Sequence, residues 1–128
     1  MQPAFPLILA SGSPRRRELL DQMGLIYTVD SPDVDENFAG RPAETVLEIS
    51  RRKAAAVAAR HPNAVILAAD TLVFADEPLG KPHTPERAKK MLMALADNWH
   101  NVYTGITLID TNSGRVVRNV DRTRVHIA

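Results

Sequence analysis

Two short apolar runs stand out in the hydrophobic pattern of the chain. Residues 6–10 (PLILA) are almost wholly apolar and stop at a Ser-Gly-Ser-Pro segment, and residues 64–69 (AVILAA) stop at Asp70. Continuous apolar runs of this length, bounded by turn residues, are typical of buried strands. We therefore predict two core strands, the second ending at Asp70, with residues 72–75 as a candidate continuation beyond a bend.

Three segments carry the start and stop signals of helices. Proline suits the first helical turn, where its missing N–H costs nothing, and Pro14, Pro42 and Pro85 would each open a helix. Thr84 is a candidate N-cap for the third helix, and Gly24 is a candidate stop for the first. We predict helices over residues 14–23, 42 to about 60, and 84–95.

The last part of the chain alternates apolar and polar residues. Residues 102–109 and 116–127 are rich in Val and Thr, and the Thr-Asn-Ser-Gly segment at 111–114 predicts a hairpin turn between them. Residues 25–29 predict a further strand, and the acidic segment 30–41 predicts a loop. Apolar strands that alternate with helices and end in a hairpin predict an α/β fold, with a mixed, partly parallel twisted sheet and flanking helices.

Composition and charge narrow the class of protein. The 128 residues suffice for one compact domain, 1–128, and a formal net charge of +1 argues against a general nucleic-acid binder. The chain has no cysteine, which removes disulfides and thiolate chemistry and fits a reducing compartment. It shows no signal peptide and no apolar run of membrane-spanning length. We expect a cytoplasmic protein with no membrane partner.

The segment SGSPRRR at 11–17 lies where the first strand gives way to the first helix. Free N–H groups at a helix N-terminus attract anions, and the hydroxyls of Ser11 and Ser13 lie nearby. Arg15 and Arg16 add guanidinium groups that match phosphate oxygens. The alternative is an ordinary capped helix with solvated arginines. The Walker spacing is absent, so this is a candidate phosphate-binding loop of another kind.

Lys53 and Asp70 are the next candidates. Helical spacing places Lys53 on one stripe with Val46, Ser50 and Val57, so it should point toward the protein body and meet a carboxylate or a phosphate. The alternative is a lysine with a packed stem and a head in water. Asp70, at the predicted end of a core strand, stands where α/β sheets bind ligands, and could hold a metal or act as a base. Its alternative is the capping of a turn.

Two weaker candidates lie in loops. Lys81 is part of a stiff Gly-Lys-Pro segment, and Glu36 lies in the acidic loop with Asp33 and Asp35, a kind of cluster that is usually only solvated. The histidines show no metal-ligand spacing, and Ser13 lacks the Gly-x-Ser-x-Gly elbow of hydrolases.

Taken together, these segments resemble the Maf family of nucleoside triphosphate pyrophosphatases, also called septum-formation-inhibitor-like proteins. They occur in the family's order and span almost the whole chain. The matching segments are LILASGSPRRRELL (7–20), Val34-Asp35-Glu36, Arg51-Arg52-Lys53-Ala54, AADTLV (68–73), Gly80-Lys81-Pro82 and His100-x-Val102-x-Thr104-Gly105.

The resemblance implies a Maf/ITPase-like fold and metal-dependent hydrolysis of a nucleoside triphosphate to the monophosphate and pyrophosphate. Asp70 would be the proton acceptor or would organise a divalent cation, Mg²⁺ or Mn²⁺, with help from Glu36. Arg15 and Thr71 match the branch that acts on dTTP and UTP, and the family also suggests a homodimer. The phosphates would be held by Ser11, Ser13, Arg15, Arg16, Lys53 and Lys81.

The chain departs from the family pattern in two places. Asp97-Asn98-Trp99 replaces the usual Ser-Gly before the histidine. Family members also continue past the strand at 122–128 into a further lobe with a glutamine thought to help read the base. We therefore expect the domain to be C-terminally incomplete, which leaves base selection open.

Two other hypotheses stay open. The basic loop would also serve a non-catalytic nucleotide or nucleic-acid binder that regulates septum formation or cell division, although the net charge makes nucleic acid the less favoured partner. Such a binder would not need Asp70. The chain would alternatively be a folding-incompetent fragment, because its last predicted strand presents an open edge.

Overall fold

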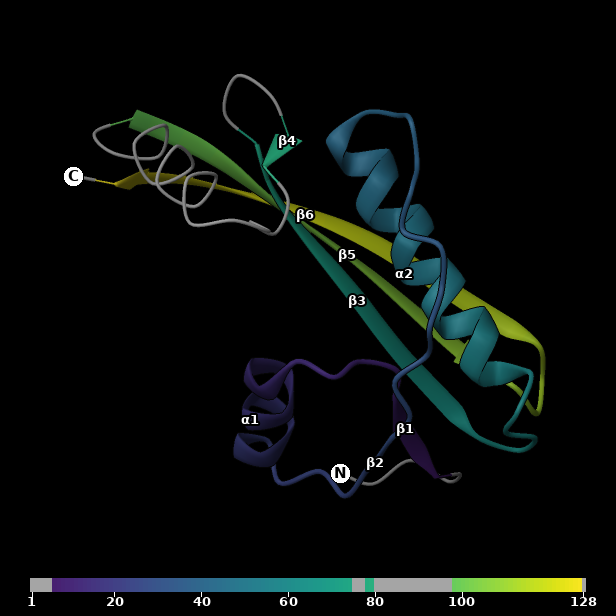
Figure 1. Ribbon diagram of the computed structural model, residues 1–128. Coiled ribbons are helices and arrows are strands. Elements are labelled where there is room, and N and C mark those ends of the chain that lie inside the picture. Colours follow the sequence, from purple (N-terminus) through teal and green to yellow (C-terminus); the bar gives the residue numbers. More distant parts are fainter. Residues whose placement is uncertain (1–5, 75–77, 80–97, 128) are drawn as a thin grey trace.

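The structure is a computed structural model that describes residues 6–74, 78–79 and 98–127. One sheet connects all the described strands, in the order β2-β1-β3-β5-β6, and β4 also pairs with β3 (Figure 1). The strands are β1 (Leu7–Leu9), β2 (Thr28–Val29), β3 (Val65–Phe74), β4 (Pro78–Leu79), β5 (Asn98–Asp110) and β6 (Arg115–Ile127). The pairs β1–β2 and β1–β3 are parallel, whereas β3–β4, β3–β5 and β5–β6 are antiparallel. The predicted mixed, partly parallel sheet is confirmed.

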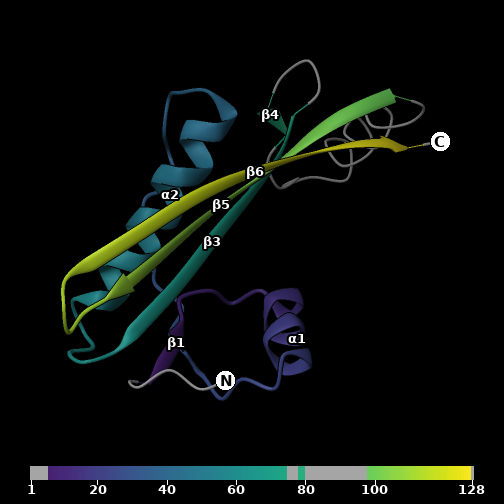
Figure 2. The same cartoon turned by 180° about the vertical axis from the view of Figure 1, so that it is seen from behind.

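Two helices lie on opposite sides of β3. Helix α2 (Pro42–Ala58) follows β3 and β5, and α1 (Pro14–Gln22) lies across β3 from it, as both views show (Figure 1, Figure 2). The side chains agree with this arrangement. Ser50 of α2 hydrogen-bonds to Thr107 of β5, whose register partner on β3 is Ala68, so these residues mark the face of the sheet that α2 covers. Arg16 of α1 hydrogen-bonds to Thr71, which alternation along β3 places on the other face. Asp70 shares the α2 face with Ala68.

The core lies between α2 and the sheet. Small side chains at this interface let the helix approach the strands closely, and burial of the apolar surface contributes about 25 cal/mol per Å². Ser50 and Thr107 are fully buried among these residues, where their hydroxyl oxygens lie 2.8 Å apart and satisfy each other. The core residues are Ile8, Ala10, Ala54, Val57, Ala64, Ile66 and Ala68.

The predicted starts of the first two helices are confirmed. Pro14 and Pro42 each occupy the start of a helix, and Gly24 follows α1 with a φ of 72°, a left-handed conformation that glycine adopts without strain. The C-terminal ends differ slightly, since α1 stops at Gln22 and α2 at Ala58. The predicted helix 84–95 and Lys81 lie outside the described residues.

The predicted bend after Asp70 is wrong. Strand β3 runs without interruption from Val65 to Phe74, and each of its ten residues has a register partner on β5. This antiparallel pairing holds the backbone extended through the polar Asp-Thr pair. Asp70 therefore lies within a strand and not at its end. The other strand predictions hold in kind, although β2 is shorter than expected and β5 begins earlier, at Asn98.

No helix among the described residues is long and apolar enough to cross a membrane.

Candidate functional site

A cleft of about 620 Å³ opens beyond the C-terminal end of β1. Strand β1 ends at Leu9, opposite Leu67, whereas β3 continues seven residues further, to Phe74. The loop that leaves β1 therefore faces the uncovered edge of β3, where Asp70 and Thr71 lie. The cleft is lined by Ala10, Ser11, Gly12, Ser13, Pro14, Arg16, Ser31, Pro32, Glu36, Lys53, Asp70 and Thr71. A ligand site at a strand end was expected. The strand that ends at the cleft is β1, whereas the carboxylate of Asp70 comes from the middle of β3.

The loop between β1 and α1 is organised around Ser11, whose side chain is buried. Its Oγ accepts hydrogen bonds from the backbone N–H of Ser13 and from Nη1 of Arg16, both at 3.2 Å. Ser13 is the N-cap residue of α1, but its side chain makes no capping bond. The capping alternative therefore does not hold for Ser13, which lines the cleft.

Arg16 connects this loop to β3. Its Nη2 donates to Oγ1 of Thr71 at 3.1 Å, and this oxygen lies 3.3 Å from Oγ1 of Thr104 on β5. Burial lowers the pKa of the Arg16 guanidinium, and the nearby Asp70 carboxylate opposes that shift. Arg16 thus brings a half-buried cationic fork into the cleft.

Lys53 brings two carboxylates together. Its Nζ lies 3.4 Å from Oδ1 of Asp70 and 3.4 Å from Oε1 of Glu36, and its side chain is only 18% exposed. The prediction that Lys53 points into the protein and meets a carboxylate is confirmed. Burial raises the pKa of Asp70, the charge of Lys53 opposes that rise, and the charge of Glu36 adds to it.

The two carboxylates fit a divalent cation in part. No group of three or more metal-ligating side chains occurs among residues 6–74, 78–79 and 98–127. However, Asp70 and Glu36 converge on one ammonium group, so they face a common point at which a cation could replace or accompany it. Mg²⁺ commonly uses one or two carboxylates and takes its other ligands from water and phosphates. The site suits an ion that arrives with an anionic ligand.

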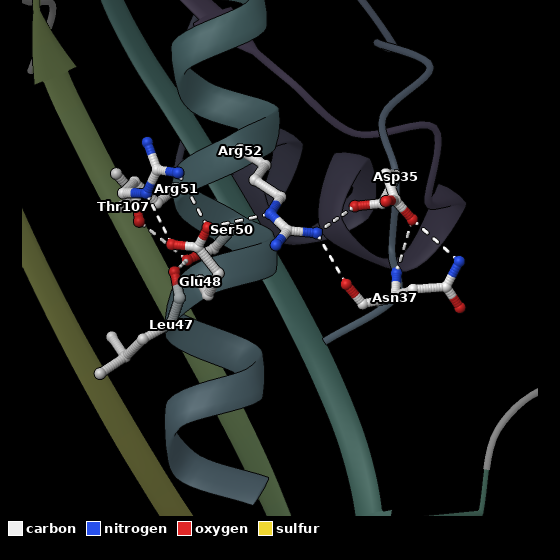
Figure 3. A network of polar contacts seen from close by, with 8 residues as sticks. All are labelled: Asp35, Asn37, Leu47, Glu48, Ser50, Arg51, Arg52 and Thr107. Atoms are coloured by element: carbon white, nitrogen blue, oxygen red, sulfur yellow. Dashed lines mark hydrogen bonds and ion pairs between the residues drawn. The ribbon is translucent and has the colours of Figure 1, made fainter. Parts of the chain in front are cut away.

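The loop of Glu36 is tied to α2 by Arg52, a residue that sequence reasoning missed (Figure 3). Arg52 Nη1 donates to the carbonyl oxygens of Asp35 (2.7 Å) and Asn37 (2.9 Å). Its Nε donates to Oε2 of Glu48 at 2.9 Å. The spacing between Glu48 and Arg52, one helical turn, was the available signal, but it predicts only an ordinary surface ion pair.

Arg15 lies outside the cleft. It is exposed and lines a second hollow of about 550 Å³ with Glu18, Leu19 and Gln22, and this hollow meets the cleft at Ser13 and Pro14. The structure therefore places Arg15 in the second hollow, beside the cleft. The predicted site residues that it brings together in the cleft are Ser11, Ser13, Arg16, Glu36, Lys53, Asp70 and Thr71. Lys81 falls outside the residues that the structure describes.

The fold and the cleft define a class, namely mixed α/β proteins that gather cations and carboxylates beyond the end of a buried parallel strand. Within that class, the chain belongs to the family of Maf-like proteins, which it matches over residues 6–128. The earlier resemblance to this family is confirmed.

Curated relatives carry the name dTTP/UTP pyrophosphatase. The chain is 46% identical to the one from Halalkalibacterium halodurans over 123 residues, which cover 94% of this chain and 64% of that protein. It is 44% identical to the one from Salinibacter ruber (98% and 63% covered) and 48% identical to the one from Myxococcus xanthus (93% and 61% covered). The chain thus spans less than two thirds of the length of each of these relatives.

A solved structure, that of a HAM1 protein from Coxiella burnetii, shares the fold. It superposes with a TM-score of 0.60 at 20% identity, over 97% of this chain and 73% of that one. The match shows the fold that the resemblance implied, a mixed sheet with flanking helices.

Proposed function

We propose that this protein hydrolyses nucleoside triphosphates to the monophosphate and pyrophosphate, with dTTP and UTP as preferred substrates. The observation that carries the proposal is the arrangement of Arg16 and Lys53 with Asp70 and Glu36 around one cleft at the start of α1. Cations and a helix N-terminus suit a polyphosphate, and the half-buried carboxylate of Asp70 suits the activation of water. The names of the curated relatives support the same reaction.

The residues of the cleft would share the substrate between them. Ser11, Ser13, Arg16 and Lys53 would hold phosphate oxygens, with Lys81 and Arg15 as further phosphate ligands. Thr71 and Arg15 would contribute to the choice of base. Stabilisation of charge on the attacked phosphate and on the leaving pyrophosphate is the largest part of such catalysis.

Asp70 would act on the attacking water. It would take a proton as the water oxygen bonds to the α-phosphorus, and the bond from that phosphorus to the bridging oxygen of the α–β anhydride would break with its electron pair leaving on pyrophosphate. A divalent cation held by Asp70 and Glu36 would supply further neutralisation of phosphate charge when bound. Lys53 would orient both carboxylates.

The products of the reaction test this proposal. We expect dTTP or UTP with Mg²⁺ to yield the nucleoside monophosphate and pyrophosphate, separated by ion-exchange chromatography. Release of the nucleoside diphosphate and inorganic phosphate would place hydrolysis at the β–γ anhydride and contradict the proposal. Tight nucleotide binding without any product would favour the regulatory alternative.

The pH dependence of kcat/KM, which reports the ionisation of the free protein, gives a second prediction. Asp70 accepts a proton only when ionised, so kcat/KM should fall as the pH drops through its pKa. Because burial raises that pKa, we expect the acidic limb at a pH above the ordinary value of 3.8. Replacing Lys53 with Met removes the opposing charge and should move the limb of the residual activity to still higher pH. A limb that stays in place in Lys53→Met would contradict the assignment of the limb to Asp70.

The setting of the reaction is also part of the proposal. A cytoplasmic location would supply nucleoside triphosphates and suit a chain without cysteine.

We further propose a homodimer as the assembly, which the molar mass from light scattering would test.

A further inference from the structure

The position of Glu36 needs an explanation, because its own packing does not supply one. It lies between β2 and α2 in a segment, residues 30–41, without helix or strand. Its side chain is 61% exposed. Ordinary loops of this kind leave their exposed side chains free to sample many rotamers. Another group must therefore hold Glu36 at the cleft.

Arg52 contacts the loop on both sides of Glu36. The two carbonyl oxygens that accept from its Nη1 belong to Asp35 and Asn37, the residues immediately before and after Glu36. The guanidinium carbon also lies 5.8 Å from the centroid of the Phe38 ring. Within the loop, Oδ1 of Asp35 accepts from the backbone and side-chain N–H groups of Asn37, both at 2.9 Å. These bonds form a compact turn with Glu36 at its tip.

The Arg52 guanidinium is itself held in place. Glu48, one turn earlier on α2, accepts from Nε of Arg52 and also from Nε and Nη2 of Arg51, at 2.7 and 2.8 Å (Figure 3). Hydrogen bonds from Arg51 and Arg52 lower the pKa of Glu48 to about 2, so it stays ionised at every pH at which the protein would be assayed. A charged partner of fixed geometry orients the Arg52 fork before the loop is bound.

We propose that Arg52 is a positioning residue that fixes Glu36 opposite Asp70, so that the two carboxylates can share one divalent cation. This step rests on the proposed function. Consecutive residues of α2 divide the task, since Arg52 holds the backbone on either side of Glu36 and Lys53 meets its carboxylate. Arg52 does not line the cleft and is not a catalytic residue.

Backbone dynamics test, without any ligand, whether Arg52 holds the turn that carries Glu36. In Arg52→Ala, we expect the NMR order parameters of residues 35–38 to fall from about 0.85, typical of rigid backbone, to below about 0.6. Arg51→Ala is the matched control, because the side chain of Arg51 hydrogen-bonds to Glu48 and not to the loop; it should leave these values unchanged. Order parameters that stay high in Arg52→Ala would overturn the inference, whether or not the protein hydrolyses nucleotides.

Binding of Mn²⁺ alone, followed by electron paramagnetic resonance, tests the second half. We expect Arg52→Ala to raise the half-saturating Mn²⁺ concentration about tenfold, Arg52→Lys to restore part of the loss, and Arg51→Ala to have no effect. In a Glu36→Gln background, Arg52→Ala should add nothing, because Arg52 acts through Glu36. Equal effects in both backgrounds would show a general structural role and overturn the proposal. Altered Mn²⁺ binding in a protein that lacks turnover would leave the positioning role standing and remove only the proposed function.

Discussion

Replacing Asp70 with asparagine is expected to lower kcat for triphosphate hydrolysis by about 10²–10⁴-fold, the usual contribution of a positioned proton acceptor. The amide is nearly the same size as the carboxylate but cannot take a proton from water. The fold should survive, because the side chain is replaced within a ten-residue strand that is paired along its whole length. Lys53 also keeps Glu36 as a partner. Pyrophosphate release measures kcat, and thermal unfolding checks the fold.

Asp33→Asn is the matched control for this substitution. Asp33 is exposed in the loop that carries Glu36 and does not line the cleft, so its loss of charge should leave kcat unchanged. Undiminished turnover in Asp70→Asn would remove Asp70 from the chemistry. If the unsubstituted protein and Asp70→Asn bind dTTP equally well and neither turns it over, the non-catalytic hypothesis would stand in place of hydrolysis.

The parts of the fold that could be predicted are those with local causes. An apolar run predicts a strand, as in β1 and β3, and a proline predicts a helix start, as in α1 and α2. Each of these features determines the structure of its own segment, within a few residues. The course of β3 beyond Asp70 has a distant cause. It is imposed by β5, whose residues 101–110 pair with all of β3 from 27 to 45 positions further along the chain. A polar Asp-Thr pair looks like a strand end until that partner is known.

The site shows the same division. Lys53 could be placed because helical spacing aligns it with buried Val46, Ser50 and Val57. For the three consecutive arginines, no comparable pattern was used to decide whether Arg15 or Arg16 enters the cleft. A weak signal existed, since Arg16 lies one turn before Leu20, the buried residue of α1. Helical spacing thus turns Arg16 toward the body of the protein and leaves Arg15 exposed.

The role of Arg52 could not be predicted for a physical reason. Its partners in the loop are backbone carbonyls, which every residue carries and no sequence pattern marks. They also lie 15 and 17 positions before it, across a loop whose path only the structure gives. The sequence could show that Glu36 belongs to an acidic cluster, but not which cation would hold its turn.

Replacing Gly105 with alanine is expected to damage both the fold and the site. An added Cβ would lie 2.4 Å from the carbonyl carbon and oxygen of Val46, so the backbone of α2 would have to move away from β5. Overpacking of this kind costs about 1–3 kcal/mol, which corresponds to a fall in Tm of about 4–12 °C. Gly105 is also the register partner of Asp70. A displaced α2 would carry Lys53 away from Asp70, so kcat should fall beyond what the lost stability explains.

Gly40→Ala separates this backbone clash from the general effect of removing a glycine. There the added Cβ would lie 2.7 Å from the Phe38 ring, a partly exposed side chain that can rotate away, so Tm and kcat should change little. A Gly105→Ala protein with the Tm and kcat of Gly40→Ala would show that α2 can slide on β5 at no cost. In that case the spacing between Lys53 and Asp70 would not depend on close packing at Gly105. The opposite result would mean that the glycine is required because the helix backbone touches the sheet beside the carboxylate.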